Sequence, residues 1–338
     1  MAALSLGVAV EKLRLAAPFR ISGYVFEAQD AVVVTLGDGV HRGRGEASGV
    51  YYLGDNAPEM LAALEANRAA IEAGIDRAAL QRLMPPCGAR NAVDCALWEL
   101  DARRAGKEVW QLAGLPSVKP LVTTFTMGAD DPAKMAEGAR KYARARALKM
   151  KLTGELDLDI ARVKAVRAAR PHTWLGVDAN QGYSVDVLDR LLPTLVDCDV
   201  SLLEQPVRRG RETELDGFSS PIPIAADESA LSLADVPGLR GRFNVVNIKL
   251  DKCGGLTEGL AIAHEARRLG LGVMVGNMVG SSLAMAPAFV VGQLCDIVDL
   301  DGPIFLARDR EPSITYDDGM VWCGKEVWGA SAASALAS

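Results

Sequence analysis

The segment Ala147-Leu-Lys-Met-Lys151 is a short apolar run that ends in charged side chains. Four further apolar runs share this design, and they end at Asp178, Glu204, Asp227 and Lys249. The intervals between successive charged ends, counted from Lys151, are 27, 26, 23 and 22 residues, which leaves room for one strand, one helix and two loops. This period predicts an α/β protein built on a (β/α)8, TIM-like barrel, with its active site at the carboxyl ends of the strands.

The chain from Lys119 onward extends this pattern. Helices are expected between the strands, for example over residues 158–169 and 256–268. Alternation of this kind implies parallel strands joined by right-handed crossovers, and a count of eight strands favours a closed barrel over an open sheet. The expected strands span residues 121–126, 148–151, 174–178, 201–204, 223–227, 245–249, 272–276 and 296–300.

The first 118 residues have a different pattern. Alternating and β-branched stretches up to residue 50 predict a meander of strands, and residues 57–73 and 89–105 have apolar side chains at helical spacing. We therefore predict an N-terminal α+β domain, a barrel and a C-terminal segment that packs back on the first domain. Their expected bounds are residues 1–118, 119–302 and 303–338.

Composition excludes several classes of function. A net charge of −6 argues against a nucleic-acid partner, and the absence of a run of about 18 apolar residues argues against a membrane span. Six cysteines without a CxxC pair favour reduced thiols and a cytoplasmic location. The three histidines all lie away from the expected strand ends, so histidine is a poor candidate for the general base.

Asp178, Glu204 and Asp227 end three consecutive expected strands. Three carboxylates in one cavity repel each other unless a cation lies between them. Oxygen ligands without cysteine or histidine favour Mg²⁺ over zinc or copper. The alternative is that each acid only caps the helix that follows it.

Lys149 and Lys151 are two residues apart, so both side chains point to the same face of their strand, which is the barrel interior. Two neighbouring ammonium groups lower each other's pKa, as a general base near neutrality requires. Lys249 lies four strands later and is expected across the barrel from Lys151. The alternative is that the lysine pair extends to solvent from the strand end.

Two lysines on either side of a metal-bound oxygen suggest removal of a proton α to a carboxylate. The metal stabilises the enediolate, one lysine takes the proton, and the other returns a proton to the opposite face. The expected outcome is 1,1-proton transfer, that is, racemisation or epimerisation. A non-catalytic binding protein on the same scaffold is the alternative from another class.

Five sequence motifs are similar to those of a known protein family: KMK (149–151), GVDAN (176–180), LLEQP (202–206), AADES (225–229) and NIKLDKCGG (247–255). In this order they resemble the enolase superfamily, in its muconate-lactonizing-enzyme subgroup. With DLDGP (299–303), the chain looks most like the dipeptide epimerases, such as L-Ala-D/L-Glu epimerase. The resemblance covers essentially the whole chain and implies an N-terminal capping domain, a Mg²⁺ cofactor and a homo-oligomer.

The resemblance also implies roles for single residues. Lys151 and Lys249 would be the acid/base catalysts, and Asp178, Glu204 and Asp227 would hold Mg²⁺. The substrate would be a dipeptide whose C-terminal residue is inverted at its α-carbon. Substrate-binding roles would fall to Lys149, Asp251, Asp299, Asp301, Tyr24 and Phe26, with the ammonium group of the dipeptide on Asp299 and Asp301. Lys252 would hydrogen-bond a metal-ligand carboxylate.

The loop expected to set specificity departs from the Ala-Glu epimerases. Those enzymes have an arginine there for the glutamate side chain, whereas Tyr24 and Phe26 lie at about that place here, with Arg20 nearby. The departure leaves room for an apolar or aromatic second residue, which Tyr51 and Tyr52 also favour. Alternatives within the subgroup are an N-acylamino acid racemase, an o-succinylbenzoate synthase or a cycloisomerase. Their substrates lack a free α-ammonium group, so the paired acids count against them.

Overall fold

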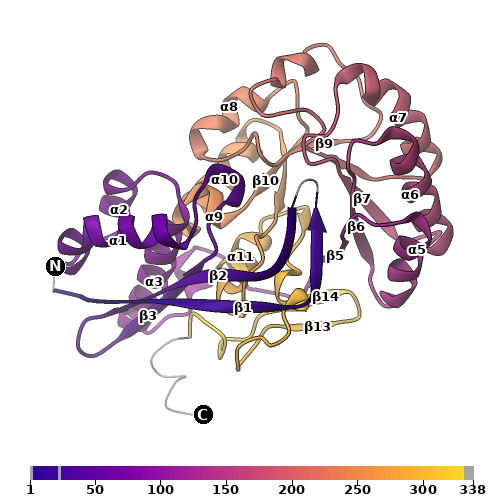
Figure 1. Ribbon diagram of the computed structural model, residues 1–338. Helices are drawn as coiled ribbons and strands as arrows, with labels where there is room; N and C mark the ends of the chain where they lie inside the picture. Colours follow the sequence, from indigo (N-terminus) through magenta and orange to yellow (C-terminus); the bar gives the residue numbers. More distant parts are fainter. Residues whose placement is uncertain (1–2, 22–23, 331–338) are drawn as a thin grey trace.

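The computed structural model describes residues 3–21 and 24–330, apart from the side chains of residues 20, 21 and 24. The N-terminal part is an antiparallel sheet of three strands in the order β1 (Ser5–Ile21), β2 (Tyr24–Gly37) and β3 (Arg42–Ala47). Three helices, α1 (Ala57–Glu72), α2 (Arg77–Leu83) and α3 (Gly88–Ala105), pack on this sheet (Figure 1). The predicted meander and both predicted helices are confirmed.

The sheet of the capping domain lies directly on α3. Val32, Val34 and Leu36 alternate along β2 and are fully buried, as expected for one covered face of an antiparallel sheet. Gly43 and Gly45 allow β3 to touch the helix, because a Cβ atom at Gly43 would lie 2.0 Å from the carbonyl oxygen of Ala96. Any larger side chain at these two positions would push the sheet away from α3.

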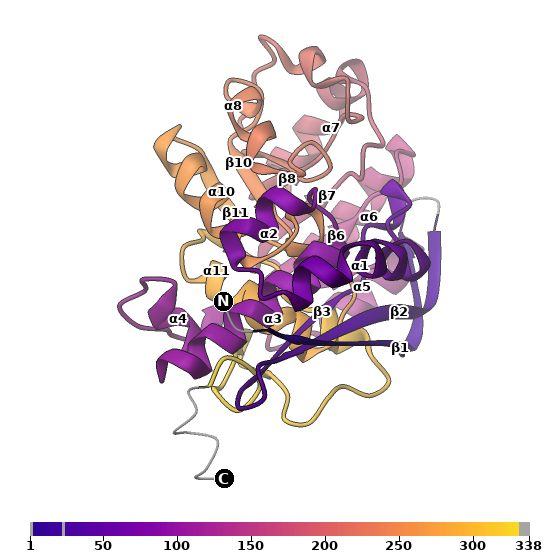
Figure 2. The same cartoon turned by 90° about the vertical axis from the view of Figure 1, so that its left-hand side faces the viewer.

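The second part is an eight-stranded parallel sheet curled into a nearly closed barrel, with helices on its outside (Figures 1 and 2). The predicted barrel with an N-terminal capping domain is confirmed. The strands are β5 (Thr124–Met127), β6 (Ala147–Lys151), β7 (Trp174–Asp178), β8 (Leu202–Glu204), β9 (Ile224–Ala226), β10 (Val245–Ile248), β11 (Gly272–Val275) and β12 (Ile297–Val298). The helices are α4 (Val109–Leu112), α5 (Pro132–Lys141), α6 (Leu156–Ala169), α7 (Val185–Asp197), α8 (Val236–Leu239), α9 (Leu250–Cys253), α10 (Leu256–Arg268) and α11 (Ser282–Gly292). Short 3₁₀ turns lie at Tyr51–Leu53, Glu212–Leu215, Leu233–Asp235 and Gly302–Phe305.

The first barrel strand is shorter than predicted. The expected strand over residues 121–126 is two elements, because the chain leaves one sheet and enters another at Thr123. Residues Leu121–Val122 form β4, which pairs with β14 (Met320–Trp322) and, through it, β13 (Thr315–Asp317). Val122, Thr123 and Thr124 are all β-branched residues that favour strands, so the sequence does not mark the break.

The barrel is closed between β12 and β5 by side chains. These strands end the eight-stranded order, and their main chains are not paired as a ladder within the described residues. Instead, Thr123 Oγ1 accepts a hydrogen bond from the Leu300 amide at 2.9 Å, and Asp301 Oδ2 accepts one from the Thr126 amide at 2.6 Å. Thr124 also donates to Asp299. The Asp-Leu-Asp segment therefore holds the barrel together.

The C-terminal segment contacts the capping domain at several points. Arg44 donates to the Val327 carbonyl oxygen at 2.9 Å, and Trp328 donates through Nε1 to the Arg44 carbonyl oxygen, also at 2.9 Å. Arg310 forms ion pairs with Glu11 and Glu46. These contacts show that the C-terminal segment packs on the capping domain. They do not show where one domain ends and the next begins, so the bounds at residues 118 and 302 stay a prediction.

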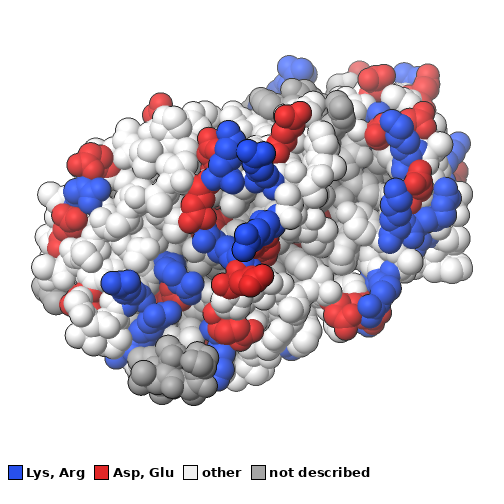
Figure 3. Space-filling model, turned by 60° about the horizontal axis from the view of Figure 1, so that its bottom comes forward, with Lys and Arg blue, Asp and Glu red and all other residues white. Residues whose placement is uncertain are grey.

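The surface carries charges of both signs. On the face in Figure 3, basic and acidic side chains lie next to one another, with broad uncharged areas between them. Among the described residues, no helix is both long and apolar enough to cross a bilayer. The cytoplasmic location and the homo-oligomeric state stay predictions.

Candidate active site

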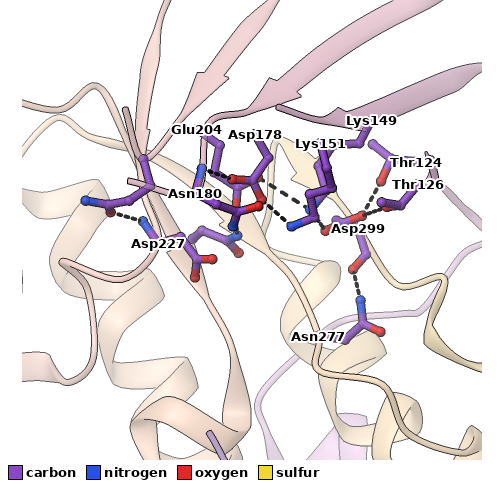
Figure 4. Close-up of polar contacts among 12 residues, drawn as sticks. Thr124, Thr126, Lys149, Lys151, Asp178, Asn180, Glu204, Asp227, Asn277 and Asp299 are labelled. Carbon is purple, nitrogen blue, oxygen red and sulfur yellow. Dashed lines mark hydrogen bonds and ion pairs between the residues drawn. The ribbon is translucent and has the colours of Figure 1, made fainter. Parts of the chain in front are cut away.

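Asp178, Glu204 and Asp227 lie together at the carboxyl ends of β7, β8 and β9. Each is almost fully buried, and each offers one carboxylate oxygen within 4.8 Å of those of the other two. They meet because parallel neighbouring strands bring their carboxyl ends to the same rim of the barrel. The predicted convergence of the three acids is present in the structure (Figure 4).

Two lysines flank this triad. Lys151, on β6, donates to Asp178 Oδ2 at 2.5 Å, and Lys249, just after β10, donates to Asp227 Oδ2 at 2.6 Å. The strand order from β6 to β10 places all three acid-bearing strands between the two lysines. The lysines therefore approach the triad from opposite sides.

Further polar groups fix the orientation of the acids. Lys252 donates to Asp227 Oδ1 at 2.6 Å, which confirms the predicted contact with a carboxylate of the triad. Asn247 donates through Nδ2 to Glu204 Oε1 at 2.7 Å. Each acid therefore has at least one carboxylate oxygen held by a neighbouring group, so its side chain loses little conformational entropy when a ligand binds.

The donor set fits a Mg²⁺ ion. Burial and the negative charge of Asp178 raise the pKa of Glu204 to about 7, and its Oε2 accepts no hydrogen bond within the described part of the chain. The Lys149 ammonium group lies 3.4 Å from this oxygen without a hydrogen bond to it, and a buried carboxylate oxygen in that state costs free energy unless a closer cation or a proton satisfies it. Three hard oxygen ligands without sulfur or nitrogen are the kind of donor set that Mg²⁺ prefers.

Lys149 differs from the expectation. Burial lowers its pKa, but Asp299 and Glu204 outweigh that effect and hold the pKa above its usual value. Its ammonium group pairs with Asp299 and lies 3.4 Å from Glu204 Oε2. The predicted lowering of pKa by mutual repulsion is therefore wrong for Lys149, because neighbouring carboxylates dominate over the second lysine.

Asp299 and Asp301 have different surroundings. Asp299 is engaged by Lys149 and Thr124, and Asn277 donates to its main-chain oxygen at 2.6 Å (Figure 4). Asp301 accepts from the Thr126 amide, and burial together with the charge of Asp299 raises its pKa to about 7. A carboxylate that is costly to ionise gains most from a cationic partner, so Asp301 is the better placed of the two to receive one.

A cavity lies between these groups and the capping domain. The barrel contributes Lys149, Lys151, Asn180, Asp227, Glu228, Lys249, Asn277, Asp299 and Asp301 to its lining. The capping domain contributes Phe19, Phe26, Gln29, Gly49, Tyr51 and Tyr52, with Phe305 from the segment after β12. The cavity is thus charged on the barrel side and aromatic on the cap side, as expected for a site that orients a small polar molecule under a lid.

Of the residues predicted to bind the substrate side chains, some line the cavity and others do not. Phe26 lines the cavity and meets Tyr51 edge to face, with ring centroids 5.3 Å apart. Tyr24 begins β2, but its side chain lies outside the described residues. Asp251 is not among the lining residues; its Oδ1 accepts hydrogen bonds from the amides of Ser48 and Gly49 at 2.9 Å and so ties the capping domain to the barrel. Its assignment to substrate binding therefore has no support from the cavity.

Several groups of the site were not predicted. Glu228 lines the cavity beside Asp227, is 3% exposed, and burial followed by the charge of Asp227 raises its pKa to about 8. Its place next to a metal-ligand candidate in AADES was the available signal. Asn277 and Phe305 could not be predicted in this way, because the prediction relied on charged side chains at strand ends and neither residue is charged.

Two family models match the chain. Residues 4–114 match the N-terminal domain of the mandelate racemase/muconate lactonizing enzyme family, and residues 133–322 match the enolase C-terminal domain-like family. The chain therefore belongs to the enolase superfamily, in the mandelate racemase/muconate lactonizing enzyme group.

Sequence identity to known proteins shows which enzymes of this group the chain resembles. The chain is 37% identical to the L-Ala-D/L-Glu epimerase of Escherichia coli over 305 residues, which cover 89% of this chain and 94% of that protein. It is 40% identical to an N-acetyl-D-glutamate racemase from a Pseudoalteromonas species over 238 residues, 70% of this chain and 75% of the other. Within its group, the chain is an epimerase of the dipeptide epimerase family.

Solved structures agree with this assignment. An enolase family member from Agrobacterium tumefaciens with homology to dipeptide epimerases, which has bound sodium and L-Ala-L-Glu, superposes with a TM-score of 0.91 at 40% identity. The superposition covers 96% of this chain and all of the other. A dipeptide epimerase from Methylococcus capsulatus in complex with Mg and L-Arg-D-Lys gives a TM-score of 0.88 at 30% identity, over 96% and 98% of the two chains.

Proposed function

We propose that this protein is a Mg²⁺-dependent dipeptide epimerase that inverts the α-carbon of the C-terminal residue of an L,L-dipeptide by 1,1-proton transfer. The observation that carries the proposal is the position of Lys151 and Lys249 on opposite sides of the Asp178–Glu204–Asp227 triad. One lysine removes the α-proton and the other returns a proton to the opposite face.

The metal would be held by the three acids of the triad. When bound, Mg²⁺ supplies positive charge that stabilises the negative charge developing on the substrate carboxylate. In its absence, burial lowers the pKa of Lys249, but Asp227, Glu204 and Asp178 together raise it well above its usual value. Neutralising those carboxylates therefore favours the free amine that a base requires.

Asp301 would hold the N-terminal ammonium group of the dipeptide. It lines the cavity, and among the described residues its carboxylate has no lysine partner of the kind that Asp299 has. Asp299 would instead keep Lys149 charged and oriented toward the substrate carboxylate. N-acyl amino acids bring no cation to Asp301, so the same carboxylate disfavours them.

The side chain of the second residue would face the aromatic surface of the capping domain. Phe26, Tyr51 and Tyr52 line this side, and the lining holds no arginine among the described residues. An apolar or aromatic side chain would be covered by these rings. We therefore propose a hydrophobic second residue.

The proposal is tested by proton exchange in D₂O. Lys151→Ala and Lys249→Ala should each lower epimerisation about 10²- to 10⁴-fold, since each removes one acid/base group. One variant should still exchange the α-proton of L,L-dipeptides and the other only that of L,D-dipeptides, as followed by mass spectrometry. Lys164→Ala, at an exposed position on α6, is the matched control and should leave both exchanges unchanged. Exchange of the same epimer by both variants would show that the lysines serve one face.

Substrate class is tested in the same assay. L-Ala-L-Phe, L-Ala-L-Glu and N-acetyl-L-Phe, each supplied to the wild-type protein with Mg²⁺, separate the alternatives. We expect L-Ala-L-Phe to exchange fastest. Faster exchange of the N-acetyl compound would favour the N-acylamino acid racemase reaction, and no exchange from any of the three compounds would count against both of these reactions.

A further inference from the structure

A second cavity of about 350 Å³ lies beside the active-site cavity. It is lined by the end of β1 (residues 16–19), the loop after β5 (126–128), α5 and the turn at Ile304 and Phe305, and it is open to solvent on one side. Phe19, Thr126 and Phe305 line both cavities, so these three side chains form the wall between them. The Phe19 and Phe305 rings contact each other, with centroids 4.7 Å apart.

The wall stands next to the proposed ammonium anchor. The amide of Thr126, a wall residue, donates to Asp301 Oδ2 at 2.6 Å. An amino acid carries its ammonium group and its side chain on the same carbon. The N-terminal side chain of a dipeptide held by Asp301 would therefore start close to this wall, on the other side of which the second cavity lies.

The lining of the second cavity is apolar near the wall. Met127, Met135, Tyr142 and Ile304 supply carbon and sulfur surface, which suits aliphatic or aromatic side chains. Asp130 and Lys134 also line it; their side chains are 46% and 69% exposed, so they lie at its open end, and they pair with each other at 3.3 Å. A side chain that enters through the wall thus meets apolar surface first and charged groups only at the outer end.

We propose that this second cavity is the subsite for the N-terminal side chain, and that it allows dipeptides with a large apolar first residue such as leucine or phenylalanine. The inference rests on the proposed dipeptide epimerase function. Its wall consists of side chains that can change rotamer, so a bulky first residue is admitted by rotation of the Phe19 and Phe305 rings.

Gly138 on α5 offers a direct test. A Cβ atom there would meet only Met127 Sδ, at an ordinary 3.9 Å, so Gly138→Leu fills the second cavity without a clash at the backbone. Leucine also has a higher helix propensity than glycine, which favours folding. Ala133→Leu, exposed on the same helix and outside the cavity, is the matched control.

The measurement is kcat/KM for L-Ala-, L-Leu- and L-Phe- dipeptides with a common second residue. Wild type should accept all three; Gly138→Leu should lose at least tenfold for the Leu and Phe substrates and less than twofold for the Ala substrate. Phe305→Ala, which opens the wall, should raise the ratio of the Phe to the Ala substrate. The inference is overturned if wild type turns over only the Ala substrate, if Gly138→Leu lowers all three equally or none, or if Phe305→Ala leaves the ratio unchanged. Failure of the proposed function is distinct, because then no dipeptide exchanges its α-proton in wild type.

Discussion

Replacement of Lys252 by methionine removes a buried cation without shortening the side chain much. Lys252 is fully buried, and its ammonium group donates to Asp227 Oδ1 and the Asp227 carbonyl oxygen at 2.6 Å, and to the Asn247 carbonyl oxygen at 3.0 Å. The substitution leaves three buried acceptors without this donor. Lys249 still holds the other carboxylate oxygen of Asp227, so the acid stays in place but is less well compensated.

The expected cost follows from the loss of one partner of a buried ion pair, which is about 3–5 kcal/mol of the free energy of unfolding. For a chain of 338 residues the entropy of unfolding is about 0.7 kcal/mol per kelvin, so Tm should fall by about 4–7 °C.

Differential scanning calorimetry at neutral pH in the presence of EDTA measures this change. The control is Lys164→Met, the same substitution at an exposed lysine of α6, which should alter stability by less than about 0.5 kcal/mol. If both variants shifted Tm by the same small amount, the hydrogen bonds of Lys252 would contribute nothing net, and its assignment as an essential partner of Asp227 would be wrong.

Other perturbations give equally specific outcomes. Asp301→Asn should lower kcat/KM for dipeptides about 30-fold or more while Mg²⁺ affinity, measured by titration calorimetry, stays within twofold; unchanged turnover would reject the ammonium anchor. Burial raises the folded-state pKa of Asp251 to about 7, above its usual value, so its contribution to stability is full below pH 4 and is lost as the pH rises toward 7. Asp251→Asn should therefore gain stability relative to wild type across this range in urea titrations at a series of pH values, and a constant difference would contradict the assignment. Treatment with EDTA should abolish exchange in D₂O and Mg²⁺ should restore it, whereas persistent exchange would exclude a metal requirement. Phe26→Arg should raise kcat/KM for L-Ala-L-Glu relative to L-Ala-L-Phe by about tenfold, and no change in this ratio would show that residue 26 does not contact the second side chain.

The barrel and the acid triad were predictable because their signals are local and repeated. Each strand is a short apolar run, and Asp178, Glu204 and Asp227 end three such runs in succession. Topology then requires neighbouring parallel strands to present their ends on one rim. Both catalytic candidates, Lys151 and Lys249, followed from the same rule.

What escaped prediction depends on contacts between distant segments. The hydrogen bond between Ser48 and Asp251 joins residues 203 positions apart, and the local sequence around either residue does not identify the other as its partner. The pKa of Lys149 depends on Asp299, 150 positions away. The division of the first barrel strand at Thr123 depends on a partner strand near the C-terminus. Local patterns carry no information on such pairings.

The charged side chains around the active-site cavity are unequal in number. Four lysines (Lys149, Lys151, Lys249 and Lys252) stand against six carboxylates (Asp178, Glu204, Asp227, Glu228, Asp299 and Asp301), a formal excess of two negative charges when all are ionised. A divalent cation brings that sum to zero, and a zwitterionic dipeptide with an uncharged second side chain leaves it at zero. Substrate and epimeric product then exchange without any change in the net charge of the enclosure, and each turnover only moves one proton from one lysine amine to the other.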